Sequence, residues 1–197
     1  MAVAYYTKAE QISLDATALL SVPRQERVGR LKREEDKKCA IAAELLLQHA
    51  CRELGLEFDP NDVVYPERGK PHFKTLPLKF NFSHSEGVTV CVVGTAEVGV
   101  DIEVPRPHHQ KIARRFLSEE CQSRIFATTD PDVAFVEEWL CIESHAKATG
   151  EGIYSPPFDK PVSDSWLFSK QTVLGEYRIC VCHELVDAPI SFVEVTL

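Results

Sequence analysis

The chain has 197 residues, of which 44% are hydrophobic and 26% charged, a composition typical of an ordinary globular protein. Its formal net charge of −8 argues against non-specific binding to nucleic acid, which requires a broad cationic surface. The N-terminal segment lacks the pattern of a signal peptide, and no stretch reaches the roughly 18 apolar residues needed to cross a bilayer. We therefore expect a cytoplasmic protein that binds neither nucleic acid nor a membrane.

The seven cysteines are scattered along the chain, and their number is odd. Cys180 and Cys182 form a close pair, but no second pair follows at the spacing of a zinc site. We therefore predict free thiols, which agrees with a cytoplasmic location.

The first half of the chain predicts a long helix followed by strands. Between Glu34 and Leu54 apolar residues recur every three or four positions, and Gly55 follows as a stop signal. Residues 59–79 are rich in Pro, Asp and Lys and are interpreted as connecting segments. Strands are predicted at three β-branched or aromatic runs separated by turn residues, at 80–82, 88–93 and 98–102.

The second half predicts helices and then strands again. Residues 112–117 have apolar positions at helical spacing, and Ser118 is a capping residue for another short helix. Asp130 followed by Pro131 predicts the start of a helix that ends near Gly150. Strands are predicted at three further runs, 166–169, 177–183 and 191–196.

The order of elements predicts an α+β fold made of two similar halves. Each half has helices and a run of strands, and the two meet near residue 100. We place the boundary between residues 1–98 and residues 99–197.

Two acids stand at the end of the predicted strand 98–102. Asp101 and Glu103 are two positions apart, so their side chains point to the same face of the sheet. Magnesium commonly takes one or two protein carboxylates and completes its shell with water and substrate phosphates. By itself such a pair is common, and two solvated acids at a strand end would be the better interpretation.

A stripe on the predicted helix 131–149 adds to this pattern. Trp139, Glu143 and Lys147 are spaced four apart, so they lie along one face. In isolation they fit an aromatic core anchor beside an exposed Glu–Lys pair. Together with Asp101 and Glu103 they supply a third carboxylate for a metal ion and a lysine for a phosphate group.

Further candidates for phosphate binding come from the first half of the chain. Each of these candidates can also be interpreted as an ordinary structural feature: a solvated helix face, a surface turn or a structural histidine. The candidates are Arg24 and Arg27 in the basic run 24–38, Lys70, Ser83 and His84.

Taken in order, five segments of the chain resemble the 4′-phosphopantetheinyl transferases of the monomeric, surfactin-synthetase-activating type. The resemblance extends over roughly residues 20–160. It rests on Gly69-Lys70-Pro71, Phe80-Asn81-Phe82-Ser83-His84-Ser85, Gly99-Val100-Asp101-Ile102-Glu103, the run Trp139 to Lys147, and Gly150-Glu151-Gly152-Ile153.

The resemblance implies a pseudo-dimeric fold with the active site between its halves. It also implies a monomeric enzyme that moves 4′-phosphopantetheine from coenzyme A to a serine of an apo carrier protein. Mg²⁺, or Mn²⁺ in its place, would be held by Asp101, Glu103 and Glu143. The catalytic set would be Glu143, Lys147 and Asp101, and coenzyme A would contact Arg24, Arg27, Lys70, Ser83, His84 and Lys147.

One position departs from the family pattern. The family usually has lysine directly before the helix glutamate, whereas this chain has Ile142. Neighbouring side chains diverge on a helix, so we expect Ile142 to leave the geometry of Glu143 unchanged. Two alternatives stay open: a relative that binds coenzyme A with reduced or lost transferase activity, and a different metal-dependent phosphotransferase or nuclease.

The acidic net charge of the chain raises the question of where an acidic carrier protein would dock. The predicted helix 112–117 is flanked by basic residues and carries apolar ones. We expect the docking surface there, around Lys111, Arg114 and Arg115.

Overall fold

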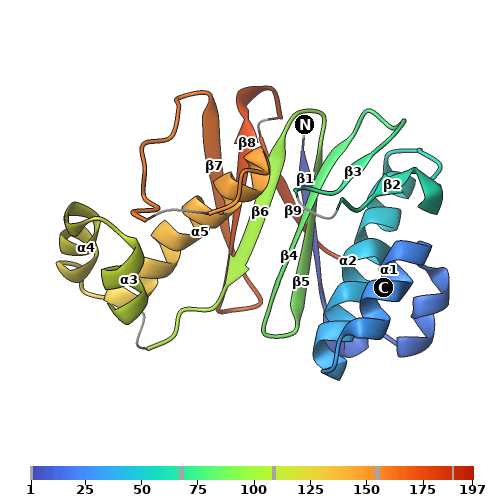
Figure 1. Ribbon diagram of the computed structural model, residues 1–197, viewed down its shortest axis with the longest axis horizontal. Coiled ribbons are helices and arrows are strands. Elements are labelled where there is room, and N and C mark those ends of the chain that lie inside the picture. The colour runs from blue at the N-terminus through green and yellow to red at the C-terminus, as the bar shows by residue number, and fades with distance from the viewer. Residues whose placement is uncertain (1, 67–68, 108–109, 154–155, 188) are drawn as a thin grey trace.

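A computed structural model describes residues 2–66, 69–107, 110–153, 156–187 and 189–197. Two β-sheets lie against each other in the middle of the molecule, and helices cover their outer faces (Figure 1). The predicted mixed α+β fold is confirmed.

The first sheet has four strands in the order β4-β5-β1-β9. Its strands are β1 (Val3–Lys8), β4 (Lys79–Ser85), β5 (Val88–Gly94) and β9 (Ser191–Glu194). Strand β1 is antiparallel to β5 and parallel to β9. The second sheet is antiparallel, in the order β6-β8-β7, with β6 (Val98–Glu103), β7 (Trp166–Val173) and β8 (Tyr177–Glu184). A two-stranded ladder joins β2 (Val63–Val64) to β3 (His72–Phe73).

The helices lie on opposite sides of this pair of sheets (Figure 1). One side carries α1 (Val22–Arg30) and α2 (Glu34–Glu53), and the other carries α3 (Gln110–Phe116), α4 (Glu119–Phe126) and α5 (Pro131–Thr149). Four short 3₁₀ segments complete the described chain: Ala9–Gln11, Leu14–Leu19, Pro60–Asp62 and Leu185–Asp187.

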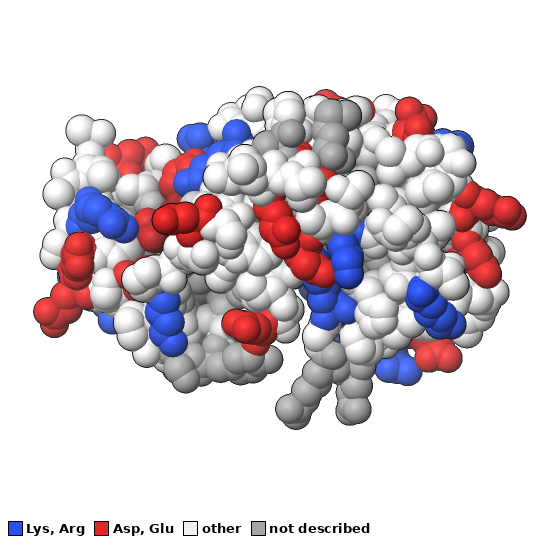
Figure 2. Space-filling view, turned by 90° about the horizontal axis from the view of Figure 1, so that it is seen from above, with Lys and Arg blue, Asp and Glu red and all other residues white. Residues whose placement is uncertain are grey.

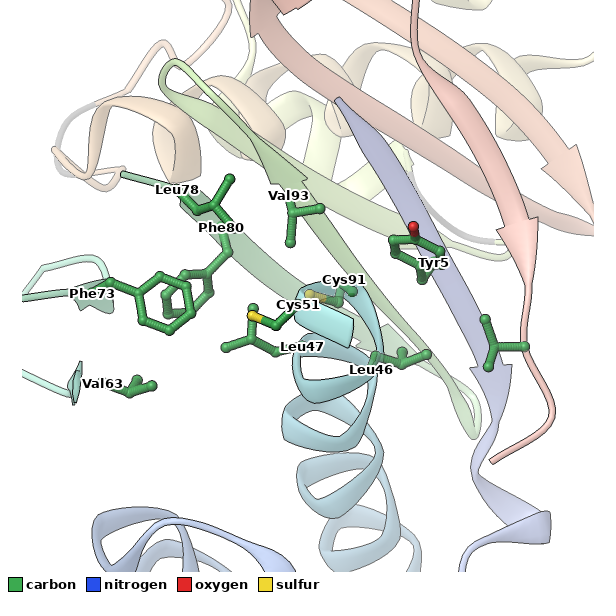
Figure 3. Close-up of a cluster of buried hydrophobic side chains, with 12 residues drawn as sticks. Tyr5, Leu46, Leu47, Cys51, Val63, Phe73, Leu78, Phe80, Cys91 and Val93 are labelled. Carbon is green, nitrogen blue, oxygen red and sulfur yellow. The ribbon is translucent and has the colours of Figure 1, made fainter. Parts of the chain in front are cut away.

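Strand β5 is buried along its whole length because both of its faces are covered. Cys91 and Val93 pack on Leu46 and Leu47 of α2, in the cluster drawn in Figure 3. The alternate residues of β5 face the second sheet, where Val100 and its neighbours complete another apolar cluster. Burial on two faces explains why the sequence of this strand is a continuous apolar run.

The predicted ends of helix α5 are confirmed. The Asp130 side chain accepts a hydrogen bond from the amide of Val133 at 3.1 Å, which caps the first turn. Gly150 ends the helix in the left-handed conformation, with φ of +73°. The Asp130 cap and Gly150 therefore determine the two ends of the helix that carries Glu143 and Lys147.

The order and pairing of the elements depart from the sequence prediction, and the short strands β2 and β3 lie within the predicted connecting segment 59–79. Strand β1 and helix α1 precede the long helix, so the chain does not begin with that helix. Strand β9 comes from the last residues of the chain but joins the first sheet beside β1. The proposed division at residues 98/99 falls at the start of β6. Strand β9 belongs to the second half of the chain but pairs with β1 of the first half. The similarity of the two halves stays a prediction.

In the described part of the chain no helix is long and apolar enough to cross a membrane. All seven cysteines are free, as predicted. The face shown in Figure 2 carries acidic and basic side chains interspersed, without one continuous basic tract.

Helix α5 lies directly on strand β6 because residue 99 is a glycine. A Cβ atom at this position would overlap the carbonyl oxygen of Ser144 and the amide nitrogen of Ala148, which are backbone atoms of α5. The absence of a side chain therefore sets the closest approach of the helix to the strand that carries Asp101 and Glu103.

We predict that Gly99→Ala lowers the free energy of unfolding by about 2 kcal/mol or more, because helix and strand must move apart. Gly29→Ala is the matched control. Its new Cβ would meet nothing within 4 Å, and alanine favours the helix in which it lies. Urea unfolding of both variants measures the difference, and equal stabilities would contradict the close approach.

Candidate functional site

A cleft of about 600 Å³ opens where the two sheets meet α1, α2 and α5. It is lined by polar and charged side chains from both predicted halves of the chain. They include Arg24, Arg27, Asp36, Tyr65, Asn81, Ser83, His84, Asp101, Glu103, Glu143 and Lys147. Of the residues predicted to bind the metal ion or coenzyme A, all except Lys70 lie in this lining.

Strands β4 and β6 are joined through side chains at the floor of the cleft. The side-chain oxygen of Asn81 accepts the amide of Val100 at 3.1 Å. Two and four positions further along β4, Ser83 donates to Asp101 at 2.8 Å and Ser85 donates to Glu103 at 3.0 Å. The alternation of strand side chains thus turns the polar residues of Asn81–Ser85 toward β6.

Asp101 is the most constrained acid of the cleft. Its side chain is 5% exposed, and Oδ1 accepts a hydrogen bond from the Lys147 ammonium at 2.6 Å. The same ammonium donates to Ser83 Oγ at 3.0 Å. These contacts tie α5 to β6 and β4, and the positive charge of Lys147 stabilises the buried carboxylate.

The other two acids are destabilised as anions by their surroundings. Burial raises the pKa of Glu103, and the negative charge of Asp101 raises it further. Burial also raises the pKa of Glu143, where Lys147 opposes the shift and Asp101 adds to it. The negative charge of Asp101 thus contributes to the raised pKa values of both glutamates, and a divalent cation beside the three acids would offset it.

The acids of the cleft provide part of the ligand set of a magnesium ion. Asp101 Oδ2 is buried and has no hydrogen-bond partner, so one ligand oxygen is available. Within the described residues no three ligand-type side chains are gathered closely enough to bind a metal ion by themselves. This matches an ion that takes only part of its ligands from the protein and the rest from water and the phosphates of a substrate.

Arg24 forms the opposite wall of the cleft. It is 5% exposed, and its Nε donates to the carbonyl of Ala40 at 3.0 Å. The guanidinium lies 5.5 Å from the ring centre of Tyr65 and 5.0 Å from that of Phe82. Contact with two aromatic rings holds the cation in place while leaving it on the cleft lining.

A buried acid supports this wall, and sequence reasoning missed it. Glu44 is fully buried and accepts hydrogen bonds from the Ser21 hydroxyl and the Tyr65 hydroxyl, both at 2.8 Å. It thereby orients the ring over which Arg24 lies. A glutamate within the apolar stretch Cys39–Leu47 was the one signal in the sequence.

His84 and Arg27 complete the basic side of the cleft. Loss of surrounding water lowers the pKa of His84, and the nearby charges of Lys147, Arg27 and Arg24 lower it further against the opposing effect of Asp36. In the absence of an anion, this histidine is therefore neutral at pH 7.

Three residues singled out from the sequence lie away from the cleft. The Lys70 ammonium contacts Glu97 and backbone carbonyls instead, so its contact with coenzyme A stays a prediction. Trp139 stacks on Phe135, with ring centres 5.7 Å apart, and acts as the core anchor. Ile142 lines a separate cavity, of about 640 Å³, whereas Glu143 lines the cleft.

The amino-acid sequence is similar to those of proteins of known family. The sequence profile of the 4′-phosphopantetheinyl transferase superfamily matches residues 97–190. A 4′-phosphopantetheinyl transferase of Bacillus subtilis is 33% identical over 146 residues, covering 71% of this chain and 64% of the relative. The 4′-phosphopantetheinyl transferase HetI of Nostoc is 36% identical over 109 residues, covering 51% and 46%, and Sfp of Bacillus subtilis strain 168 is 28% identical over 144 residues, covering 71% and 64%.

Over residues 97–190 the chain matches the 4′-phosphopantetheinyl transferase superfamily. Within the superfamily match lie Asp101, Glu103, Glu143 and Lys147, while the basic wall around Arg24 precedes it. The chain spans between 46% and 64% of the length of these three relatives.

The ion pair in this phosphopantetheinyl transferase fold gives a direct test of the charge balance. We predict that Lys147→Met lowers the free energy of unfolding of the metal-free protein by about 1–3 kcal/mol, because Asp101 keeps its buried charge and loses its cation. Mg²⁺ should then raise the melting temperature of this variant more than that of the unmodified protein.

Lys170→Met is the control, since Lys170 pairs with Glu137 at 2.8 Å outside the cleft. Thermal unfolding with and without Mg²⁺ gives the comparison. If Mg²⁺ raises the melting temperature of the unmodified protein and of both variants equally, Mg²⁺ does not replace the charge of Lys147 beside Asp101, and the prediction is wrong.

Proposed function

We propose that the protein transfers the 4′-phosphopantetheine group of coenzyme A to a serine of an apo acyl or peptidyl carrier protein, in a Mg²⁺-dependent reaction. The observation that carries the proposal is one cleft in which two acids of β6 face Glu143 and Lys147 of α5, with Arg24 and Arg27 on the opposite wall. An anionic ligand with several phosphates matches this division into a basic wall and an acidic, metal-binding wall.

The basic wall would bind the 3′-phosphate of coenzyme A. Arg24 and Arg27 present guanidinium groups, whose planar donors match phosphate oxygens. His84 and Ser83 lie between this wall and the acids, where the pyrophosphate would pass. A phosphate beside His84 would favour its protonated form and so give it a charged donor.

The acidic wall would hold the reacting pyrophosphate. Asp101 and Glu103 would bind Mg²⁺, with Glu143 as a further ligand, and the ion would supply positive charge against the pyrophosphate when bound. The serine hydroxyl of the carrier attacks the β-phosphorus, and the bond to adenosine 3′,5′-bisphosphate breaks. Lys147 would stabilise the charge that develops on the phosphoryl oxygens.

The serine proton needs an acceptor within the cleft. Glu143 faces the cleft and is the acceptor that the family resemblance implies, acting directly or through a water molecule. Because a carboxylate that binds the ion is a weaker base, transfer through a water molecule fits its role as a metal ligand better.

The proposal is tested by incubating apo carrier protein with coenzyme A and Mg²⁺ and measuring the intact mass of the carrier. We expect a phosphopantetheine adduct, and a rate at least ~100-fold lower for Asp101→Asn and for Glu143→Gln. Glu137→Gln is the control on the same helix, because Glu137 pairs with Lys170 instead of lining the cleft.

The outcome of this assay separates the proposal from its main alternative. If the carrier gains no adduct under conditions in which an active relative modifies it, the transferase proposal fails. Calorimetry with coenzyme A would then identify a binding protein without turnover, the case suggested by Ile142.

Helix α3 offers a surface for an acidic carrier. Lys111, Arg114 and Arg115 are exposed on this short helix, and Ile112 is 40% exposed beside them. Basic side chains around an apolar one suit a partner with acidic and apolar groups. We also infer a monomer in the cytoplasm, a reducing compartment that suits the free cysteines.

We predict that Arg114→Glu combined with Arg115→Glu raises the KM for carrier about 10-fold and leaves coenzyme A affinity unchanged, because only the carrier meets this surface. Steady-state kinetics and calorimetry give the two values. Arg52→Glu, an exposed charge reversal in α2, is the control and should change neither. Loss of coenzyme A binding in the double variant would contradict this docking surface.

A further inference from the structure

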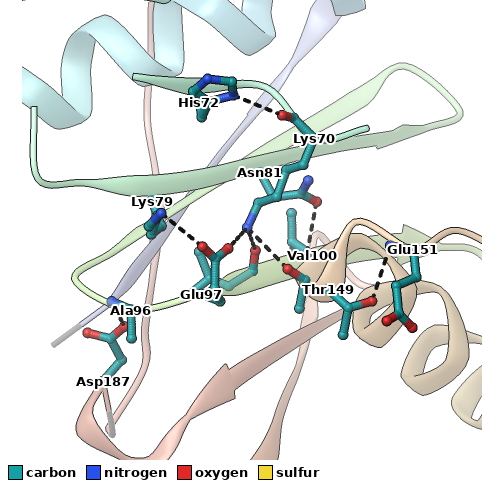
Figure 4. Close-up of polar contacts among 12 residues, drawn as sticks. Lys70, His72, Lys79, Asn81, Ala96, Glu97, Val100, Thr149, Glu151 and Asp187 are labelled. Atoms are coloured by element: carbon teal, nitrogen blue, oxygen red, sulfur yellow. Dashed lines mark hydrogen bonds and ion pairs between the residues drawn. The ribbon is translucent and has the colours of Figure 1, made fainter. Parts of the chain in front are cut away.

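The ammonium of Lys70 lies at a junction of three segments. It donates to the Glu97 carboxylate at 2.8 Å, to the carbonyl of Val98 at 2.7 Å and, more weakly, to the carbonyl of Ala148 at 3.5 Å (Figure 4). Its side chain is 12% exposed. A loop of the first half of the chain thus contacts the start of β6 and the end of α5.

These three acceptors account for every proton of the ammonium group. A lysine ammonium has three donors and no acceptor. The carbonyl of Ala148 lies in the last turn of α5, where carbonyl groups lack partners within the helix and a positive charge is favourable. To bind a phosphate, Lys70 would have to give up one of these contacts.

The backbone around Lys70 fits the same junction. A Cβ atom at Gly150, the residue that ends α5, would lie 3.6 Å from Cβ of Lys70. The same added atom would lie 3.9 Å from the backbone nitrogen of Lys70, so the backbone of Lys70 lies beside the end of the helix.

Glu97 is held from a second side, which fixes it as a partner for Lys70. Its other carboxylate oxygen accepts from Lys79 at 2.9 Å. Lys79 is the first residue of β4, and within the described part of the chain its ion pair is with Glu97. The two lysines share one acid, but Lys70 also contacts the helix.

We propose that Lys70 is a positioning residue: it ties the C-terminal end of α5 to the start of β6 and so sets how Glu143 and Lys147 face Asp101 and Glu103. This role replaces the phosphate contact that the family resemblance implies for Lys70. This inference depends on the proposed function only because that function makes the positioned residues an active site.

Hydrogen exchange of the protein without metal or coenzyme A tests the junction independently of activity. The amide of Gly150 donates to the carbonyl of Ala146 at 3.0 Å, so its protection reports on the end of α5. We expect Lys70→Met to speed its exchange ~10-fold, and Lys79→Met to change it less than ~2-fold.

A second variant guards against misfolding caused by an unpaired acid. Lys70→Met combined with Glu97→Gln removes both charges of the pair, and it should show the same faster exchange at Gly150. Unchanged protection in both Lys70 variants would overturn the proposal.

Ligand measurements separate positioning from phosphate binding. In Lys70→Met we expect the Mg²⁺ concentration for half-maximal transferase rate to rise ~10-fold, because the acids are displaced. The Kd for coenzyme A measured in EDTA should stay within ~2-fold of the unmodified protein. A ~10-fold weaker Kd in EDTA together with unchanged exchange at Gly150 would instead assign Lys70 to a phosphate. If the unmodified protein has no transferase activity, the proposed function fails and the exchange result still decides the role of Lys70.

Discussion

The contact between Lys147 and Asp101 holds the site together, because it is the point where α5, β6 and β4 meet around one buried charge. A carboxylate that is 3% exposed is costly unless a cation lies beside it, and Lys147 provides that cation from the facing helix. Within the described residues Glu103 and Glu143 have no ion pair of this kind; burial raises the pKa of each, and the negative charge of Asp101 raises it further. Lys147 therefore compensates the charge of Asp101 and only partly offsets the charges of Glu103 and Glu143. Such a cleft suits a ligand that brings a cation together with phosphate groups.

Much of the architecture could be predicted from local signals. The apolar spacing of α2, the Asp130 cap and Gly150 stop of α5, and the β-branched runs of β5 and β6 each depend on nearby residues alone. The spacing of Asp101 and Glu103 likewise predicted that their side chains share a face. That these two acids line one cleft with Glu143 and Lys147 was expected from the combined motifs and the family resemblance, not from a local signal.

What could not be predicted depends on contacts between distant segments. The pairing of β9 with β1 joins the two ends of the chain, and no local pattern specifies such a partner. Glu44 contacts Ser21 and Tyr65 across 23 and 21 positions, so its support of the basic wall was not visible in the sequence. Lys70 followed the family motif, yet its position against α5 and Glu97 emerges only from the fold.

The central claim is that acids from β6 and α5 share one divalent cation together with coenzyme A. Electron paramagnetic resonance of Mn²⁺, titrated with coenzyme A present, measures this binding directly. The account predicts one bound ion per chain, with Asp101→Asn and Glu143→Gln each weakening its binding at least ~10-fold and Glu137→Gln leaving it unchanged. Mn²⁺ binding that is unaffected by Glu143→Gln would show that the helix does not contribute to the ion site, and would contradict the account.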